Sequence, residues 1–215
     1  TATGTTTVTI NGGTIVKAQG GSGGAGIGSG DDSKGTTEVI IKSGTIEEAL
    51  GGNLGDGIGS NSRSRRNSPN ATTTVKIEGG TIKKAKGGKG YGEFYDAGDG
   101  IHSDGTLTIP GTATIVSAIG GDGDSSYSSS KAGHGIYSKG DLTISGGTIG
   151  SWKADGKTPD TDTGAFGGNT TAGAKGGDGI HSDGTINITS GEIVNAQGGK
   201  GTGTCLLYTS DAADE

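Results

Sequence analysis

The stretch "GTTTVTINGGTIVKAQGG", Gly4–Gly21, is the first copy of a pattern that recurs along the chain. Val8 and Ile10 lie two residues apart, and after a glycine pair Ile15 precedes Ala18. Alternation with a period of two predicts β-strands with one buried face, and glycine suits the corners between them. The stretch therefore predicts short strands separated by tight corners.

The pattern begins near residues 4, 35, 71, 105, 140 and 184, so six units cover most of the chain. Five units also contain an isoleucine in a "G-I" pair, at Ile27, Ile58, Ile101, Ile136 and Ile180. A unit this small cannot bury its own apolar residues, but stacked copies bury them in one column. We therefore predict an all-β, right-handed parallel β-helix (solenoid) of about six coils with three short strands each.

The composition alone would also fit a disordered, glycine-rich linker, because 50 of the 215 residues are glycine. A linker predicts no register between units, whereas the aliphatic residues keep theirs through all six. We therefore expect residues 1–204 to form a single β-helix domain that is a fragment of a longer protein.

The last eleven residues, "CLLYTSDAADE" at 205–215, match nothing upstream. They resemble the translation of a transposon sequencing adapter, so we interpret them as a non-native tail. The tail contains the only cysteine of the chain, Cys205, and three of its acidic residues, Asp211, Asp214 and Glu215. Without it, disulfides, thiol catalysis and cysteine-ligated metals are excluded.

Several classes of partner are not expected. The formal net charge is −6 and aromatic residues make up 4% of the chain. The sequence therefore indicates neither a broad basic face nor enough rings to stack on bases, and we do not expect nucleic-acid binding. No apolar stretch is long enough to cross a membrane, so we expect no membrane insertion. We expect a monomer.

The second apolar run of a unit, such as Ile15–Ala18, ends in "A-x-G-G". Insertions gather mainly between this "A-x-G-G" and the unit's "G-I" strand. They occupy Gly88–Gly98, Gly121–Gly133 and a long segment, Asp155–Gly177. One corner of the rod is therefore expected to carry the variable loops, and in solenoids the loop-bearing face often binds the partner.

The segment "GDGIHSDG" occurs at Gly98–Gly105 and again at Gly177–Gly184, with the near-copy "GHGIYSKG" at Gly133–Gly140 between them. Because the isoleucine points inward, the next residue of each copy is expected to point outward. Aligning the copies places three rings in one row on adjacent coils. This ring row consists of His102, Tyr137 and His181.

Polar residues flank the ring row on both sides. Asp99, His134 and Asp178 precede the strands, and Asp104, Lys139 and Asp183 follow them. Three interpretations stay open. The first is surface pairing that stabilises the stacked strands.

The second interpretation is a carbohydrate platform, with the three rings stacking on sugars and His134 and Lys139 binding their hydroxyl or carboxyl groups. Trp152, which replaces a small residue of its unit, is a further candidate for sugar stacking if it is exposed. The third interpretation is a calcium site, since calcium prefers carboxylate and carbonyl oxygens. Its candidate ligands are Asp99, Asp104, Asp178 and Asp183. A zinc site formed by the histidines is the weaker form of this third hypothesis, because the two "IHSD" histidines are expected about 10 Å apart.

The repeats also resemble a known family. "GDGIHSDGTLTI" and "GHGIYSKGDLTISGGTI" are similar to carbohydrate-binding parallel β-helix proteins, with a pectate-lyase-like fold, of anaerobic polysaccharide-degrading bacteria. The resemblance is best over Ala97–Gly199, while Gly4–Ser60 is similar to repeats of large clostridial surface proteins. It implies a secreted or cell-surface bacterial protein that binds cellulose or acidic sugars and carries calcium.

From these observations we expect an extracellular or cell-surface module that binds polysaccharide, either plant cell-wall or acidic glycans. The alternative is a non-catalytic stalk or adhesin segment of a bacterial surface protein. An exposed ring row would favour binding, and a covered one would favour the stalk. A polysaccharide-lyase-like enzyme is the third possibility, but no catalytic set stands out, since the best acid–base pairing joins His134 to Asp99 or Asp178.

Overall fold

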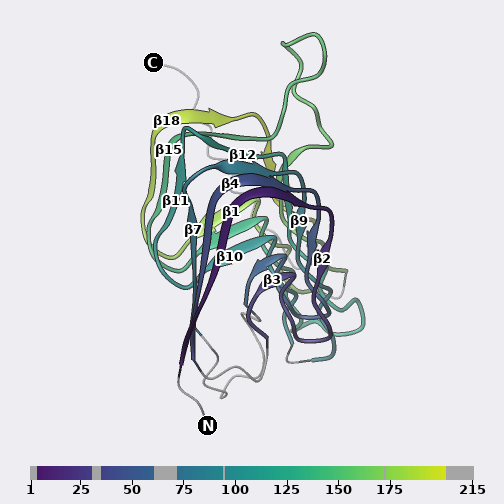
Figure 1. The fold of residues 1–215 in the computed structure, drawn as a ribbon. Coiled ribbons are helices and arrows are strands. Elements are labelled where there is room, and N and C mark those ends of the chain that lie inside the picture. The colour runs from purple at the N-terminus through teal and green to yellow at the C-terminus, as the bar shows by residue number, and fades with distance from the viewer. Residues whose placement is uncertain (1–3, 31–34, 61–71, 94, 172, 202–215) are drawn as a thin grey trace.

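The computed structural model describes residues 4–30, 35–60, 72–93, 95–171 and 173–201 (Figure 1). The tail at 205–215 lies outside these residues. All the regular structure in them is β-strand, in nineteen strands. Among the described residues there is accordingly no helix long and apolar enough to cross a membrane.

The strands form three parallel sheets. The first sheet contains β1 (Thr5–Ile15), β4 (Thr36–Ile46), β7 (Thr72–Ile77), β8 (Gly80–Ile82), β11 (Leu107–Pro110), β12 (Ala113–Ile115), β15 (Leu142–Ile149) and β18 (Ile186–Ile193). The second sheet contains β2 (Ala18–Gln19), β5 (Ala49–Leu50), β9 (Ala85–Lys86), β13 (Ser117–Ile119), β16 (Gly164–Phe166) and β19 (Ala196–Gln197). The third sheet contains β3 (Ile27–Gly28), β6 (Ile58–Gly59), β10 (Ile101–Ser103), β14 (Ile136–Ser138) and β17 (Ile180–Ser182).

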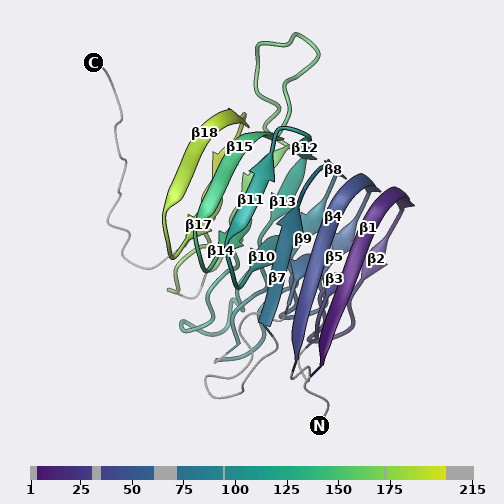
Figure 2. The same ribbon diagram turned by 60° about the vertical axis from the view of Figure 1, so that its left-hand side comes forward.

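The chain visits the three sheets in the same order on every turn. β1, β2 and β3 form the first coil, and the order repeats up to β18 and β19, which begin a sixth coil after five complete turns. Figure 2 shows the first-sheet strands side by side, from purple β1 to yellow β18. The predicted parallel β-solenoid with three strands per coil is confirmed.

The register between coils places equivalent residues directly above one another. Val8 pairs with Val39, and Val39 with Val75, while Ile101 of the third sheet pairs with Ile58 and Ile136. These positions supply the buried column that the repeat predicts, since the interior side chains of the middle coils are almost completely excluded from solvent. Burial of this column is the main source of the solenoid's stability.

The second apolar run of a unit, such as Ile15–Ala18, was expected to form one strand of its own. Instead its isoleucine lies in the first sheet and its alanine in the second. In β1, β4, β15 and β18 the strand continues through the glycine pair, and the Thr-Ile step after it is still paired in the first sheet. Gly13 and Gly44 have φ of +75° and +95° there. Glycine adopts these angles without strain, so the strand bends at this point while its ladder resumes beyond it.

One corner closes in the same way whatever the length of the loop that it carries. After the second sheet, the second glycine of the "GG" pair accepts a hydrogen bond from a glycine N–H at the far end of the loop, at 2.9 to 3.0 Å in coils one to three. Coils four and five repeat the closure from Gly133 to Gly121 and from Gly177 to Gly168. The insertions therefore leave the core of each coil unchanged.

Coil five differs from the expected alignment. Its second-sheet strand is β16, in which Ala165 pairs with Ala118 of β13, so "AFGG" at 165–168 is its copy of "A-x-G-G". The predicted insertion at Asp155–Gly177 is therefore wrong as a single loop. Residues 150–163 project from the corner between the first and second sheets (Figures 1 and 2), and only 168–177 lies at the common corner.

Candidate functional site

The ring row is in the predicted register. His102 pairs with Tyr137 across β10 and β14, and Tyr137 pairs with His181 across β14 and β17. The ring centroids of successive members are 4.7 and 5.4 Å apart, and the planes are tilted. Three coils therefore bring one continuous set of rings to the third sheet.

The ring row is covered at two of its three members. His102 is 2% exposed and Tyr137 is 9% exposed, whereas the His181 side chain is 37% exposed. The Tyr137 ring covers His102 on one side, and Gly59 gives it room on the other. Alternation along a strand fixes which way a side chain points, but the neighbouring coils decide whether solvent reaches it.

His102 lies between carboxylates rather than sugars. Its Nδ1 atom is 3.3 Å from Oδ2 of Asp56 and 3.3 Å from Oδ2 of Asp99, and both of these residues are completely buried. Asp56 accepts hydrogen bonds from the backbone N–H groups of Ser60 and Asp99. Asp99 accepts one from the N–H of His134 at 2.6 Å. We call Asp56, Asp99 and His102 the lower cluster.

Two pKa values in the lower cluster are shifted upward. Burial raises the pKa of Asp56 above its usual value. Burial also opposes a charge on His102, but the carboxylates of Asp56, Asp104 and Asp99 outweigh it and hold the pKa of His102 well above its usual value. Both directions indicate a site that favours bound positive charge.

Asp104 and Lys139 lie at the outer side of the lower cluster. Asp104 Oδ1 is 3.7 Å from His102 Nε2 and 3.8 Å from Lys139 Nζ, and Asp104 Oδ2 accepts the N–H of Thr73. Burial opposes ionisation of Asp104, but its contacts with His102, Thr73 and Lys139 outweigh that effect and lower its pKa. Lys139 itself stays largely exposed.

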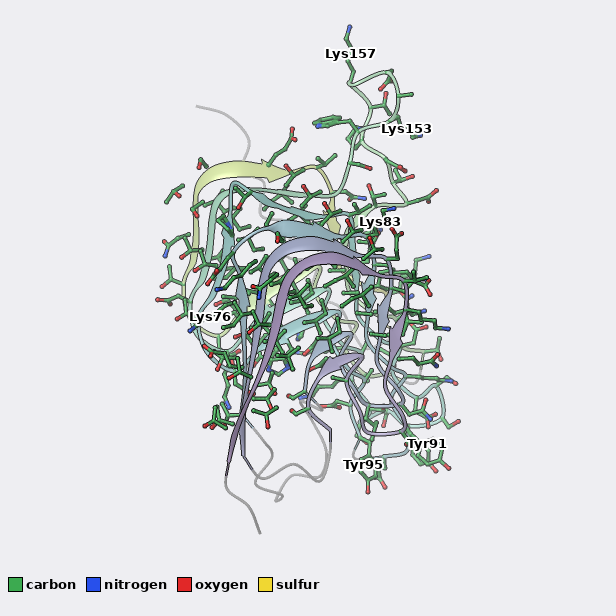
Figure 3. All side chains as sticks on the ribbon, in the orientation of Figure 1. Lys76, Lys83, Tyr91, Tyr95, Lys153 and Lys157 are labelled. Atoms are coloured by element: carbon green, nitrogen blue, oxygen red, sulfur yellow. The ribbon has the colours of Figure 1, made fainter. Side chains whose placement is uncertain are left out.

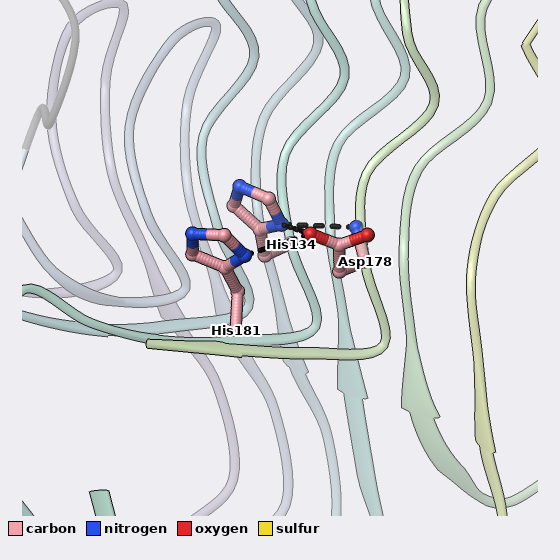
Figure 4. Close-up of side chains that lie close together, drawn as sticks. All are labelled: His134, Asp178 and His181. Atoms are coloured by element: carbon pink, nitrogen blue, oxygen red, sulfur yellow. Dashed lines mark hydrogen bonds and ion pairs between the residues drawn. The ribbon is translucent and has the colours of Figure 1, made fainter. Parts of the chain in front are cut away.

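A second cluster occupies the equivalent positions two coils further on (Figure 4). It consists of His134, Asp178 and His181, and we call it the upper cluster. His134 Nδ1 accepts the backbone N–H of Asp178 at 2.9 Å, and His181 Nδ1 lies 2.8 Å from Asp178 Oδ2. The two imidazole rings stack at 4.5 Å.

Asp183 joins the ring row to the upper cluster. It accepts a hydrogen bond from the Tyr137 hydroxyl at 2.6 Å, and its other oxygen is 3.2 Å from His181 Nε2. The four aspartates predicted as calcium ligands thus separate into two groups. Asp99 and Asp104 lie around His102, and Asp178 and Asp183 lie around His181. The carboxylates of either group alone offer fewer oxygens than the six to eight that calcium prefers, and calcium binding stays a prediction.

Trp152 lies in the projecting segment between the first and second sheets, whereas the ring row is on the third sheet. It pairs with Pro159 across that segment, is 40% exposed, and donates from Nε1 to Glu192 of β18 at 2.9 Å. Since Ala165 occupies the inward position of coil five, Trp152 does not replace the small residue of its unit.

A groove that the sequence analysis did not identify runs over the second sheet. Its two adjoining hollows, of about 420 and 370 Å³, share Lys86 and Asp122 in their walls. One wall is the row of outward side chains of the second sheet, which pair in register across all six coils. This row consists of Gln19, Leu50, Lys86, Ile119, Phe166 and Gln197.

Glycine pairs form the floor of the groove. A Cβ atom on Gly88 would lie 1.6 Å from the carbonyl oxygen of Gly52, and one on Gly121 would lie 2.0 Å from that of Gly88. Successive coils therefore approach at backbone contact along this line, and no side chain can fill the space above it. The "GG" of each repeat is the signal from which the groove could have been anticipated.

The second wall of the groove is polar. It follows the glycine pairs and consists of Asn53, Lys89, Asp122, Asn169 and Lys200. Asp122 Oδ1 accepts the N–H of Asn169 at 2.7 Å, and Asn169 Oδ1 accepts the N–H of Lys200 at 2.8 Å. With Lys86 on the opposite wall, the groove has three lysines and one aspartate. It is therefore locally basic in an acidic chain.

Asp56 is the member of the lower cluster that the sequence analysis missed. It lies two residues before Ile58, as Asp99 does before Ile101, so the repeat alignment contained the signal. The pairing of Ile101 with Ile58 brings the two positions together.

No known family model, curated protein or solved structure matches the chain significantly.

Proposed function

We propose that the protein binds an extended acidic polysaccharide in the groove over the second sheet. The observation that carries the proposal is the basic, glycine-floored groove, whose walls are built from every coil from β2 to β19. Because the coils stack along its length, a polymer lying in it would meet equivalent positions at each step of about 4.8 Å.

The charge of the groove favours an anionic chain. Lys86, Lys89 and Lys200 line it, and Lys86 and Lys200 form no ion pair within 4 Å with any described residue, unlike Lys83 and Lys84, which pair with Glu47 and Glu48. Free ammonium groups can bind the carboxylates of uronic acids, and this attraction weakens as salt is added.

The shape and rigidity of the groove favour a carbohydrate chain. The Phe166 ring and the apolar side chains of Leu50 and Ile119 give one wall a surface on which sugar rings can pack. The walls are held by hydrogen-bonded strands, so little order has to be gained on binding, which lowers the cost of association. The groove also borders the loop-bearing corner that the insertions mark as variable.

The ring row has a different part in this proposal from the one expected. Burial of His102 and Tyr137 removes them from direct contact with a glycan, and it is the feature expected of a stalk. We therefore assign sugar binding to the groove and a stabilising role to the ring row.

The test is titration of polygalacturonate, with a neutral cellulose derivative as the matched ligand, into the protein at low and at physiological ionic strength. Lys86→Gln with Lys89→Gln should weaken polygalacturonate binding, by roughly 2- to 5-fold for each lysine. Lys157→Gln is the control, because Lys157 lies on the projecting segment away from the coils (Figure 3).

The assignment to the groove would be overturned if the groove variant and the control variant changed the affinity for polygalacturonate equally. A well-folded protein that binds neither polymer would favour the stalk or adhesin alternative.

A further inference from the structure

The lower cluster has an unusual defect in its hydrogen bonding. Neither Nδ1 nor Nε2 of His102 has a hydrogen-bond partner among the described residues, although both atoms are buried. Buried polar atoms are almost always satisfied, and an exception calls for a specific explanation. Nδ1 instead faces, at 3.3 Å, two carboxylates that are themselves completely buried.

The spacing of these atoms suits a metal ion better than a proton. Nδ1 of His102 lies 3.3 Å from Oδ2 of Asp56 and 3.3 Å from Oδ2 of Asp99. A charge-assisted N–H···O hydrogen bond is shorter, about 2.7–2.9 Å. Zinc bonds to nitrogen and oxygen of about 2.0–2.1 Å at tetrahedral angles place neighbouring ligand atoms about 3.3–3.4 Å apart. Both contacts therefore match an edge of such a tetrahedron.

We propose that Asp56, Asp99 and His102 bind a divalent transition metal of the zinc type, which joins the second coil to the third. One candidate ligand atom from each residue lies within 4.8 Å of the others. Two carboxylates and a neutral imidazole balance a divalent charge in full, whereas an imidazolium alone leaves one buried negative charge uncompensated.

The chemistry of the donors selects against calcium. Imidazole nitrogen is a common ligand of zinc and of other first-row transition metals, while calcium takes six to eight oxygen ligands at longer distances. The lower cluster offers two carboxylates and one imidazole. It is therefore a site for a small ion with few ligands, and it is independent of glycan binding in the groove.

The surroundings hold the three ligands in place. Backbone N–H groups of Ser60 and Asp99 fix the Asp56 carboxylate, and the N–H of His134 fixes the second oxygen of Asp99. Asp104 Oδ1 lies on the Nε2 side of His102, at 3.7 Å, where metal-binding histidines commonly direct their other N–H. The two carboxylates are thus oriented by backbone groups that do not ligate.

The upper cluster has equivalent positions but lacks the defect. His134 Nδ1 already accepts an N–H from the backbone, and His181 Nδ1 has Asp178 at hydrogen-bond distance. It is therefore the internal control: it also combines histidine and aspartate at the equivalent positions of the solenoid, but none of its described nitrogens is buried without a hydrogen-bond partner.

The experiment measures metal binding by the full chain without an affinity tag, in a Cys205→Ser background so that no thiol competes. Zn²⁺, Co²⁺ and Ca²⁺ are titrated separately into protein treated with chelator. We expect one Zn²⁺ per chain, retained after dialysis and measured by elemental analysis. We also expect intense visible Co²⁺ absorption bands that report tetrahedral coordination, and no competition from Ca²⁺.

The decisive variant is Asp99→Asn, which can still accept the N–H of His134 through Oδ1 but presents an amide to His102. It should weaken Zn²⁺ binding by more than the ~10–100-fold that loss of an outer ligand contact costs. The matched control Asp178→Asn should bind Zn²⁺ as the parent does. Should Asp99→Asn fail to fold, the parent's Co²⁺ spectrum decides alone. Absent tetrahedral bands, or equal Zn²⁺ affinity in a folded Asp99→Asn variant, would overturn the proposal.

Discussion

The lower and upper clusters occupy the same repeat positions two coils apart, yet their surroundings differ. In the lower cluster every side chain is buried, and His102 lies 3.3 Å from two carboxylates without a hydrogen bond. In the upper cluster Asp178 is exposed and His181 is partly exposed, and both rings have a partner at a hydrogen-bond distance of 2.8 or 2.9 Å.

Two features account for the difference. Tyr137 covers His102 from the next coil, whereas β17, which carries His181, is an edge strand of the third sheet, with no described strand beyond it. In addition, His134 occupies in the upper cluster the position that Asp56 occupies in the lower one. Its ring accepts the backbone N–H of Asp178, whereas the Asp56 carboxylate accepts the equivalent N–H of Asp99. A position in a repeat therefore does not define an environment, because the adjacent coils supply half of it.

The largest expected effect comes from removing the imidazole of each cluster in turn. His102→Ala leaves two buried carboxylates facing each other, so we expect it to lower the free energy of unfolding by about 3–5 kcal/mol. His181→Ala should cost less than about 1 kcal/mol because its contacts are exposed. Denaturant unfolding in the presence of chelator measures both. Equal losses would show that burial does not distinguish the clusters.

The second effect comes from the space beside His102. A Cβ on Gly59 would lie 2.7 Å from Asp56 Oδ2 and 2.9 Å from the His102 carbonyl oxygen, at a φ of +146°. We expect Gly59→Ala to cost about 2–3 kcal/mol of unfolding free energy. Gly13→Ala is the control, because it has a φ of +75° and no atom within 4 Å of its Cβ. It should cost about 1 kcal/mol, and an equal cost at Gly59 would mean that crowding is not the cause.

A third, smaller effect concerns the residue that links the clusters. Tyr137→Phe keeps the ring over His102 but removes the 2.6 Å hydrogen bond to Asp183. We expect a loss of about 1–2 kcal/mol. The NMR signals of the His181 ring should shift, while those of the covered His102 ring should change little. A large change at His102 alone would contradict this division.

The smallest effect is expected for Asp178→Asn. Asp178 is more than half exposed, and its contacts with His134 and His181 are open to solvent. Its loss should change the free energy of unfolding by no more than about 1 kcal/mol. Thermal unfolding at two salt concentrations would check it, and a loss as large as that of His102→Ala would refute the assigned exposure.

The sequence was sufficient to predict the solenoid because its interior obeys simple periodicity. Isoleucine and valine recur at fixed intervals, and the structure pairs Val8 with Val39 and Ile101 with Ile136 as the alignment required. The alignment failed in coil five, where "AFGG" at 165–168 is the true copy of "A-x-G-G" and was placed inside the predicted insertion.

The candidate sites were harder to predict, for two physical reasons. Alternation indicates that His102 points away from the isoleucine column but contains no information on the Tyr137 ring that covers it. The groove exists because Gly88 and Gly121 have no side chains. A search of the sequence for reactive or charged side chains does not find such a feature. Both features emerge only from contacts between coils.

The glycine hydrogen bond that closes the common corner has a consequence for how such a chain can change. The loop between Gly21 and Gly24 is closed in the same manner as the one between Gly121 and Gly133. Loop length is therefore uncoupled from the geometry of the coil. Evolution, or a protein engineer, can insert peptide segments at this corner on any coil, side by side along the groove, and vary them without redesigning the scaffold that displays them.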